Sequence, residues 1–445
     1  MAQAKGNNAL GKLGKLTELR QRILFVVGAL AVFRLGSFIP VPGVNPDAMS
    51  NLVNGSGLMD MFNMFSGGAL ERFSVFALGV IPYISASIVV QMMGSVVPSL
   101  QQLRKEGEAG KRKMTMYTRI GTVGLALFQS FGIAVALQKQ VAAGGAPVVY
   151  TPGFGFVFAS VVGLTAGTMF LMWIGEQMTE RGIGNGISLL IFAGIVAGLP
   201  GAVVQTLNMS GNGELSVLML LIVVVVVLGV TAFCVFMERA QRRITVNYAR
   251  RSGGARAYQN QSSNLPLKIN MSGVIPPIFA SSLLMFPATA ASWFGSGTDA
   301  GWFGSTLQRL GQMLTPGEPV YEIVSATLVI GFAFFYTAIV FNADETADNL
   351  KRSGALIPGI RPGKSTASYI DAVMTRLTAV GALYLALVCF VPSFMQKFWH
   401  VPFYFGGTSL LIVVVVVMDF TAQVQAHLVS HQYESLLKKA NLRRN

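Results

Sequence analysis

Few residues in the apolar segments of this sequence could carry chemistry. Arg34 and Asp419 lie within long apolar segments, and Glu176 lies at the end of another. A charge buried in a membrane is what couples a transporter to ions or protons, so these three residues would form its relay. Each is better interpreted as an interfacial or paired structural residue than as a relay member.

Catalytic and metal-binding patterns are missing from the sequence. It has no His-Glu-x-x-His, no Gly-x-Ser-x-Gly and no Gly-x-x-x-x-Gly-Lys-[Ser/Thr], the patterns of zinc peptidases, serine hydrolases and phosphate-binding loops. The histidines His400, His427 and His431 all come late in the chain, and Cys234 and Cys389 fall in apolar segments without metal-ligand spacing. We therefore expect no enzyme activity, no metal site and no cofactor.

The composition indicates a lipid environment. Hydrophobic residues make up 52% of the 445 residues and charged residues only 12%, whereas soluble domains carry about 25% charged residues. A helix needs roughly 20 apolar residues to cross the hydrocarbon core, and the run LMLLIVVVVVLGVTAFCVF provides them. Valine runs also occur in buried strands, but this run is too long and uninterrupted for that interpretation.

Hydropathy predicts ten membrane-spanning helices. Their expected ranges are 22–41, 73–97, 117–138, 154–174, 184–205, 215–236, 272–293, 319–341, 374–394 and 404–425. Most of the 33 basic residues lie in the two tails and in alternate connections. Because basic loops are retained on the cytoplasmic side, we expect a multi-pass inner-membrane protein with both termini in the cytoplasm.

The expected spans divide into two sets of five at a polar external connection, TLNMSGNGE. Because five is odd, the second set enters the membrane in the opposite direction, which is the pattern of an inverted repeat. The predicted organisation is an amphipathic cytoplasmic N-terminal tail (1–21), a first half (22–205), an external hinge (206–214), a second half (215–425) and a cytoplasmic C-terminal tail (426–445).

Prolines interrupt two spans that hold the same place in each half. Pro82 lies early in the second span, and Pro276, Pro277 and Pro287 lie in the seventh. Proline removes a backbone donor and frees a carbonyl that lipid cannot satisfy. Ordinary kinks would explain one such span, but interrupted helices at matching positions of two halves favour a transport pathway between them.

Small residues accompany both interrupted spans. Small side chains let helices approach closely without a strong apolar seal, so the seam between these spans could part sideways. The small residues are Ser85, Ala86 and Ser87 in one span and Ala280, Ser281 and Ser282 in the other. In contrast, the Gly194 and Gly198 pair in the fifth span, spaced as Gly-x-x-x-Gly, is expected to mark permanent packing.

The segment LMDMFNMFSGGALERF, ahead of the second span, is too short and too polar to cross the membrane. It is apolar on one side but contains Asp60, Asn63, Glu71 and Arg72. Two interpretations stay open: an interfacial helix on the outer surface, or a re-entrant segment that fills a cavity and can be displaced. Gly67 and Gly68 would give it a flexible exit.

Two basic connections, 237–271 and 342–373, are much longer than the two to eight residues usual between packed helices. Long loops often bind partners. Their charge alone would also be explained by topology and by contact with anionic lipids, but their length favours a macromolecular partner. In the second of them, Arg361 lies in the tight turn PGIRPG, where it could present a bidentate donor to a carboxylate or phosphate.

Three function classes compete on these observations. The first is a passive, gated channel sealed by aliphatic side chains, with energy supplied by a partner. The second is a secondary transporter of a small solute with five spans in each half. The third is an assembly scaffold for membrane proteins without a pore of its own.

The chain resembles the SecY family, the channel subunits of the bacterial protein translocon, from about Gly14 to Leu442. The similarity is carried by long motifs, among them FRLGSFIPVPG, MFNMFSGGALERFSVFALGVIPYISASI, MFLMWIGEQMTERGIGNGIS, MERAQRRITVNYARR and FYTAIVFNADETADNLKRSGALIPGIRPG. The resemblance implies an all-α polytopic membrane protein. Its ten transmembrane helices would form two inverted five-helix halves, a clamshell around a central hourglass pore. Secretory chains would cross it, and transmembrane segments would leave sideways into lipid.

The resemblance also implies functional residues. The pore ring would be Val80, Ile84, Ile187, Ile191, Ile278 and Ile412; Val80 replaces the usual isoleucine and could seal slightly less tightly. The plug segment would be residues 58–72, centred on Met61, Phe62, Asn63, Met64, Phe65, Ser66, Gly67 and Gly68. The lateral gate would include Ser85, Ser87, Ser282 and Phe286.

The implied partners are the membrane subunits SecE and SecG, the motor ATPase SecA, the ribosome, the secretory and membrane polypeptides that are transported, and anionic lipids. The motor and the ribosome would bind the basic loops. Their docking residues would be Arg239, Arg242, Arg243, Arg250, Arg251, Arg256 and Arg361, the last of which matches the family's contact arginine.

Overall fold

The computed structural model describes residues 17–54, 57–138, 140, 147–213, 216–248, 262–294, 306, 309, 313–314, 318–399 and 407–442. Most of them are helical. The long helices are α2 (Thr17–Gly36), α5 (Ile81–Val96), α7 (Glu108–Gln138), α8 (Phe154–Arg181), α9 (Gly186–Gly211), α10 (Val217–Arg239), α11 (Ile275–Phe294), α13 (Pro319–Val340), α15 (Lys364–Trp399) and α16 (Gly407–Leu442). The shorter helices are α3 (Pro46–Asn54), α4 (Gly57–Ser66), α6 (Pro98–Lys105) and α14 (Ala343–Arg352).

Polar caps fix where several of these helices begin. The Asn185 side chain accepts from the backbone N–H groups of Ile187 and Ser188 at the start of α9. The Ser216 hydroxyl accepts from the N–H of Met219 at the start of α10. Such caps satisfy donors that have no partner inside the helix, and they mark the ends of the apolar runs.

Among the described residues, seven helices are long and apolar enough to cross a membrane, or eight if α5 and α6, which are bent by 101°, form one span. The seven are α7, α8, α9, α10, α13, α15 and α16, while α11 is shorter over its described apolar part. A multi-pass membrane fold is therefore confirmed, whereas the count of ten spans stays a prediction.

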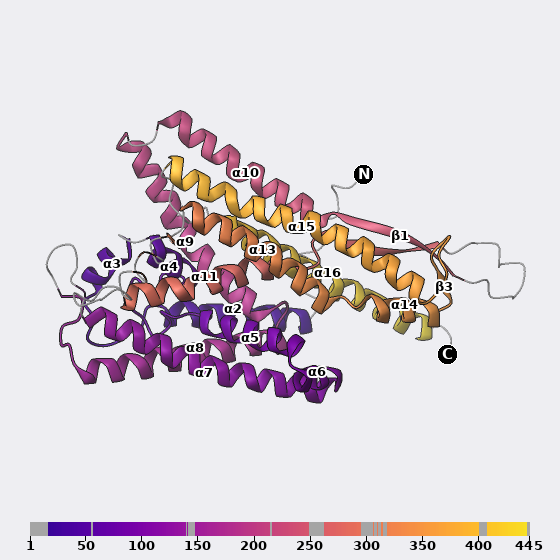
Figure 1. Cartoon of the computed structure of the whole chain (residues 1–445), viewed down its shortest axis with the longest axis horizontal. Coiled ribbons are helices and arrows are strands. Elements are labelled where there is room, and N and C mark those ends of the chain that lie inside the picture. Colours follow the sequence, from indigo (N-terminus) through magenta and orange to yellow (C-terminus); the bar gives the residue numbers. More distant parts are fainter. Residues whose placement is uncertain are drawn as a thin grey trace, which may run out of the picture.

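The helices pack mainly within the two sets expected from the sequence. In the first set, α7 packs on α5 and α8, and α8 packs on α2 and α9; in the second, α15 packs on α13, α10 and α16. The sets meet where α11 lies against α5 and α7 and where α16 lies against α9. In Figure 1 the indigo and magenta helices α5, α7 and α8 lie below, and α10, α13 and α15 lie above.

The long basic connections contain strands, which the sequence reading did not predict. Strand β1 (Gln241–Tyr248) pairs antiparallel with β2 (Ser262–Lys268) on one edge and with β3 (Ala355–Leu356) on the other. A separate apolar cluster combines the strand residues Ile244, Val246 and Leu267 with Ile357 and Ile370. Both connections therefore join in one small sheet at the end of the molecule that also carries α6 and α14 (Figure 1).

The second span begins later than its hydropathy predicts. Residues 67–80 form successive turns, and α5 starts only at Ile81. Pro82 lies in the first turn of α5. Backbone N–H groups in a first turn have no acceptor within the helix, so the N–H that proline lacks breaks no helical hydrogen bond. Pro82 therefore starts a helix instead of kinking one, and Pro276 and Pro277 have the same place in α11. Only Pro287 lies inside the seventh span.

Candidate functional site

The six residues of the expected pore ring all belong to one apolar cluster. Val80, Ile84, Ile191, Ile278 and Ile412 are buried in it, and Ile187 is half-buried and packs against it. They come from the starts of α5, α9, α11 and α16, four helices distributed over both sets. The structure thus brings these residues into the apolar core where the two sets meet, while their action as a constriction stays a prediction.

A repeated tetrapeptide positions two members of the ring. The sequence Gly-Val-Ile-Pro occurs at 79–82 and again at 273–276. Both glycines are left-handed, with φ of 56° at Gly79 and 61° at Gly273, a conformation that costs glycine least. In each copy the valine carbonyl accepts from the N–H of the isoleucine four residues later, Ile84 or Ile278. The repeat is a sequence signal, available before the structure, that α5 and α11 begin in the same way.

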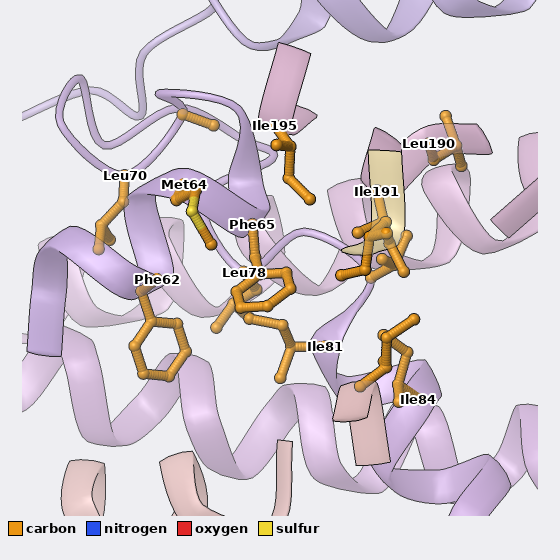
Figure 2. Packing of buried hydrophobic residues seen from close by; sticks show 14 of the residues in the cluster. Phe62, Met64, Phe65, Leu70, Leu78, Ile81, Ile84, Leu190, Ile191 and Ile195 are labelled. Atoms are coloured by element: carbon orange, nitrogen blue, oxygen red, sulfur yellow. The ribbon is translucent and has the colours of Figure 1, made fainter. Parts of the chain in front are cut away.

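The plug segment is buried, and this supports the re-entrant interpretation over a helix on the outer surface. Its helix α4 packs against α9, and Phe62, Met64 and Phe65 belong to the same cluster as the pore ring. Figure 2 shows Phe65 beside Leu78 and Ile81, with Ile191 and Ile195 nearby. The side chain of Met61 lies outside the described residues. The helix therefore lies next to the expected ring.

The polar residues of the plug segment satisfy its own backbone. The Asn63 side chain accepts from the N–H of Glu71 at 3.0 Å. The Ser66 hydroxyl donates to the Asn63 carbonyl at 3.1 Å and accepts from the N–H of Leu70 at 3.3 Å. Asn63 and Ser66 are 1% and 0% exposed. They allow a bend to be buried without unpaired polar groups, so they do not indicate a water-facing helix.

The turn after α4 is built on close glycine contacts. Gly67 and Gly68 have φ of 70° and 81°, so the glycines stabilise a defined bend where flexibility was expected. A Cβ on Gly194 would lie 3.1 Å from the carbonyl oxygen of Phe65. Gly194 was expected to mark permanent helix packing, but in the structure it makes room for the plug segment.

The expected lateral gate lies where α11 contacts α5 and α7. Ser282 is buried, and Ser85 and Ser87 are half-buried. The Ser87 hydroxyl accepts from the side-chain amide of Gln91, four residues later on the same helix, at 2.9 Å. Phe286 belongs to α11, but its side chain lies outside the described residues. The described serines therefore lie on two helices that contact each other across the two sets, and their role as a lateral gate stays a prediction.

Two open cavities adjoin this contact, and the sequence reading did not anticipate them. One, of about 700 Å³, lies between α5, α6, α7 and α13 and is lined by Tyr83, Ser87, Gln91 and Tyr336 among others. The other, of about 1290 Å³, adds Asp344, Glu345, Lys364 and Asp371. Tyr83, Ser87 and Gln91 recur every four residues, which places them on one helix face. This polar stripe on an otherwise apolar helix was the sequence signal that could have predicted a cavity on that face.

Arg104 connects the two sets beside these cavities. Its guanidinium, carried by α6, donates to the carbonyl of Ile339 near the end of α13. The side chain is exposed and borders both cavities. The wider cavity is lined by residues of α5, α6, α13, α14 and α15. In Figure 1, α6 and α14 lie toward the same end of the molecule as the sheet of the basic connections, so the cavity lies between the two sets near that end.

The described docking residues are exposed. Arg239 ends α10, Arg242 and Arg243 lie on β1, and Arg361 lies in the turn before α15, where the hydroxyl of Thr366 donates to its carbonyl at 2.9 Å. Gly359 and Gly363 flank that turn with positive φ. Arg250, Arg251 and Arg256 lie outside the described residues. The basic surface is thus presented on a sheet and a defined turn.

The ionisable residues considered as a relay are dispersed. Arg34 donates to the carbonyl of Gly67, Glu176 forms a bidentate pair with Arg119 on α7, and Asp419 is exposed on α16. Each of the three thus has surroundings of its own, and their interpretation as structural residues stays a prediction. No group of three or more metal-ligating side chains occurs within the part of the chain that the structure describes.

Known proteins resemble this chain over its full length. A model of the SecY family matches residues 74–421. The protein translocase subunit SecY of Escherichia coli (strain K12) is 58% identical over 445 residues, covering 100% of this chain and 99% of that protein. The subunit of the same name from Vibrio cholerae is 57% identical with the same coverage.

Solved structures share the fold at low sequence identity. One described as the structure of a protein conducting channel has a TM-score of 0.66 at 15% identity, covering 93% of both chains. Sec61 in a canine ribosome-channel complex from the endoplasmic reticulum has a TM-score of 0.65 at 14% identity, again covering 93% of both. These likenesses establish a common architecture.

Proposed function

The chain belongs to the SecY family, and we propose that it is the central subunit of the channel that moves secretory polypeptides across the cytoplasmic membrane and releases transmembrane segments sideways into lipid. The observation that carries the proposal is the position of α4. This short helix lies buried against α9. Its residues Phe62, Met64 and Phe65 belong to the same apolar cluster as aliphatic residues from the starts of α5, α9, α11 and α16. A displaceable helix on an aliphatic constriction can close a pathway that must pass many different sequences.

In this proposal the pore ring is Val80, Ile84, Ile187, Ile191, Ile278 and Ile412. Apolar side chains dewet a narrow passage and so block ions without binding them. The same side chains offer no specific hydrogen bonds to a passing chain, so they tolerate varied cargo. The α5–α11 contact, with Ser85, Ser87 and Ser282, is the lateral gate, because small residues seal a seam only weakly.

The basic end of the molecule is the proposed docking face for SecA and the ribosome. Its exposed arginines on β1 and at Arg361 support this assignment, because arginine pairs well with carboxylates and phosphates. Two solved relatives of the same fold are described as ribosome-bound channels. SecE and SecG are the proposed membrane partners, and the proposed location is the bacterial inner membrane with both termini in the cytoplasm.

Site-specific photocrosslinking tests the pathway. A crosslinker is placed at Ile84 or Ile278, and a secretory chain is stalled during transport. Both positions should label the stalled chain, because they lie in the proposed constriction. Leu228 on α10 is the matched control, since it is 63% exposed on a peripheral helix and should not label. If the stalled chain never labels the two isoleucines, or labels Leu228 equally, the pore assignment fails.

Crosslinking, together with variants that neutralise Arg34 and Asp419, separates the channel from a solute transporter or a scaffold. A secondary transporter would lose activity when Arg34 and Asp419 are both made neutral, because coupling needs buried charge. A scaffold would contact substrates only on its lipid-facing surface. Labelling within the ring, combined with transport that persists when Arg34→Gln and Asp419→Asn are combined, favours the channel.

A further inference from the structure

The plug helix α4 ends on a hydrogen bond from another helix. Arg34, in the last turn of α2, donates from Nη1 to the carbonyl oxygen of Gly67 at 2.8 Å. Gly67 directly follows α4 and takes the left-handed conformation that commonly ends helices. The two residues are 33 positions apart, so the bond ties the plug segment to the first helix of the chain.

The close packing around Gly67 leaves the Arg34 guanidinium as the donor that satisfies the Gly67 carbonyl. Gly67 is buried, and a Cβ added there would lie 3.0 Å from the Cα of Gly194 and 3.4 Å from the ring of Phe33. The last carbonyl groups of a helix have no N–H donor within the helix, and the closely packed glycines leave little space for a water molecule to supply one. A guanidinium satisfies such a carbonyl and also complements the negative end of the helix dipole.

The guanidinium of Arg34 depends on the plug segment in turn. It is half-buried, and no ion pair found among the described residues includes it. It also lies over the ring of Phe38, 4.8 Å from the ring centroid, while Arg72, at the end of the plug segment, lies 4.4 Å from the same centroid. The aromatic ring attracts both cations and so offsets their mutual repulsion.

We propose that Arg34 is the positioning residue that holds the plug segment in its closed place, so that opening must break the Arg34–Gly67 bond. The inference rests on the proposed function, in which α4 closes the pathway. Displacing α4 removes the acceptor and leaves a half-buried charge without a hydrogen-bond partner, which opposes opening. The same residue considered above as a possible transport relay thus sets how readily the channel opens.

The test measures how often the plug segment leaves its place. Ser66, which is fully buried, is changed to cysteine in a variant that carries Cys234→Ala and Cys389→Ala. The rate of labelling by a membrane-impermeant maleimide is then measured on the complete channel complex in membranes. Arg34→Gln should raise this rate about tenfold, because a charge-assisted hydrogen bond is lost. Arg34→Lys, which keeps the positive charge but lacks the planar guanidinium, should raise the labelling rate about threefold.

Arg22→Gln is the matched control, because Arg22 lies on the same helix in an exposed pair with Glu18 and should leave the rate unchanged. Resting ion leak is measured in parallel. An unchanged labelling rate in Arg34→Gln overturns the proposal. Faster labelling without added leak supports the role of Arg34 but contradicts the sealing role of α4. If Arg34→Gln does not accumulate in membranes, a parental rate in Arg34→Lys overturns the proposal instead.

Discussion

Gly67 and Gly194 lie so close together that neither could carry a side chain without moving the other: a Cβ on Gly67 would lie 3.0 Å from the Cα of Gly194. Gly194 belongs to α9, and Gly67 directly follows the plug helix α4. The plug segment therefore fits against α9 by backbone contact, and the quality of this fit depends on the size of one residue.

Gly194→Val should weaken the closed state. The added methyl groups would meet the Phe65 carbonyl oxygen, to which even a Cβ would be only 3.1 Å away, and overpacking of this kind costs about 1–3 kcal/mol. We expect at least a fivefold rise in resting ion leak, measured in membrane vesicles. Gly201→Val on the same helix is the control, because nothing lies within 4 Å of a Cβ there. Equal leak in both variants would contradict the contact.

Polar substitution in the pore ring should wet the constriction. Ile187→Asn combined with Ile278→Asn replaces two apolar side chains of the proposed seal. Ile278 is buried and Ile187 is half-buried, and a fully buried isoleucine contributes about 1.5–3 kcal/mol. We expect higher resting conductance in planar bilayers and export of precursors with defective signal sequences. Ile120→Asn on α7, a position 58% exposed, should change neither. Unchanged conductance in the double variant would count against the ring.

Reversing the charge at Arg361 should impair motor-driven export more than membrane insertion of the chain itself. Arg361 is exposed on a turn that glycines fix on both sides, and losing a bidentate contact costs about 1.5–3 kcal/mol. Arg361→Glu should therefore weaken SecA binding at least tenfold, measured by titration on membrane vesicles. Arg376→Glu, an equal charge change at an exposed position on α15, serves as control. Equal loss of export and insertion would indicate misfolding.

The Arg119–Glu176 pair should contribute to the packing of α7 on α8. Two hydrogen bonds join the groups, at 3.1 and 2.7 Å, and the Glu176 side chain is only 15% exposed. Arg119→Leu leaves that carboxylate unpaired and should destabilise the protein by about 1–3 kcal/mol. Adding Glu176→Leu should restore much of the loss, which thermal unfolding in detergent would detect. If the two effects simply add, the pair does not couple the helices.

The sequence predicts the membrane helices well because lipid imposes one dominant requirement. A long apolar run such as 217–239 has no alternative to forming a helix, since its backbone must be satisfied internally. Hydropathy failed at 73–80, where the residues are as apolar as a span but are buried by protein in a series of turns. A hydropathy average does not distinguish burial by protein from burial by lipid.

The paired prolines indicated the region of the candidate site, and the resemblance supplied its individual residues, but the structural effect of the prolines was misjudged. Pro82 and Pro276 start helices, and the glycines before them, Gly79 and Gly273, supply the bend. The contact of Arg34 with Gly67 could not be predicted, because it depends on how two distant segments pack. The sheet formed by β1, β2 and β3 escaped notice because its strands lie in polar loops and pair across about 100 residues of chain.

That sheet joins the two basic connections mechanically. Strand β1 follows α10 and is held on one edge by β2, which leads into α11, and on the other by β3, which precedes the turn that carries Arg361. A force on the Arg361 turn would either break the short β1–β3 pairing or move β1 and β2 together with β3. Force applied to the Arg361 turn would therefore be passed through β1 and β2 to the first residues of α11.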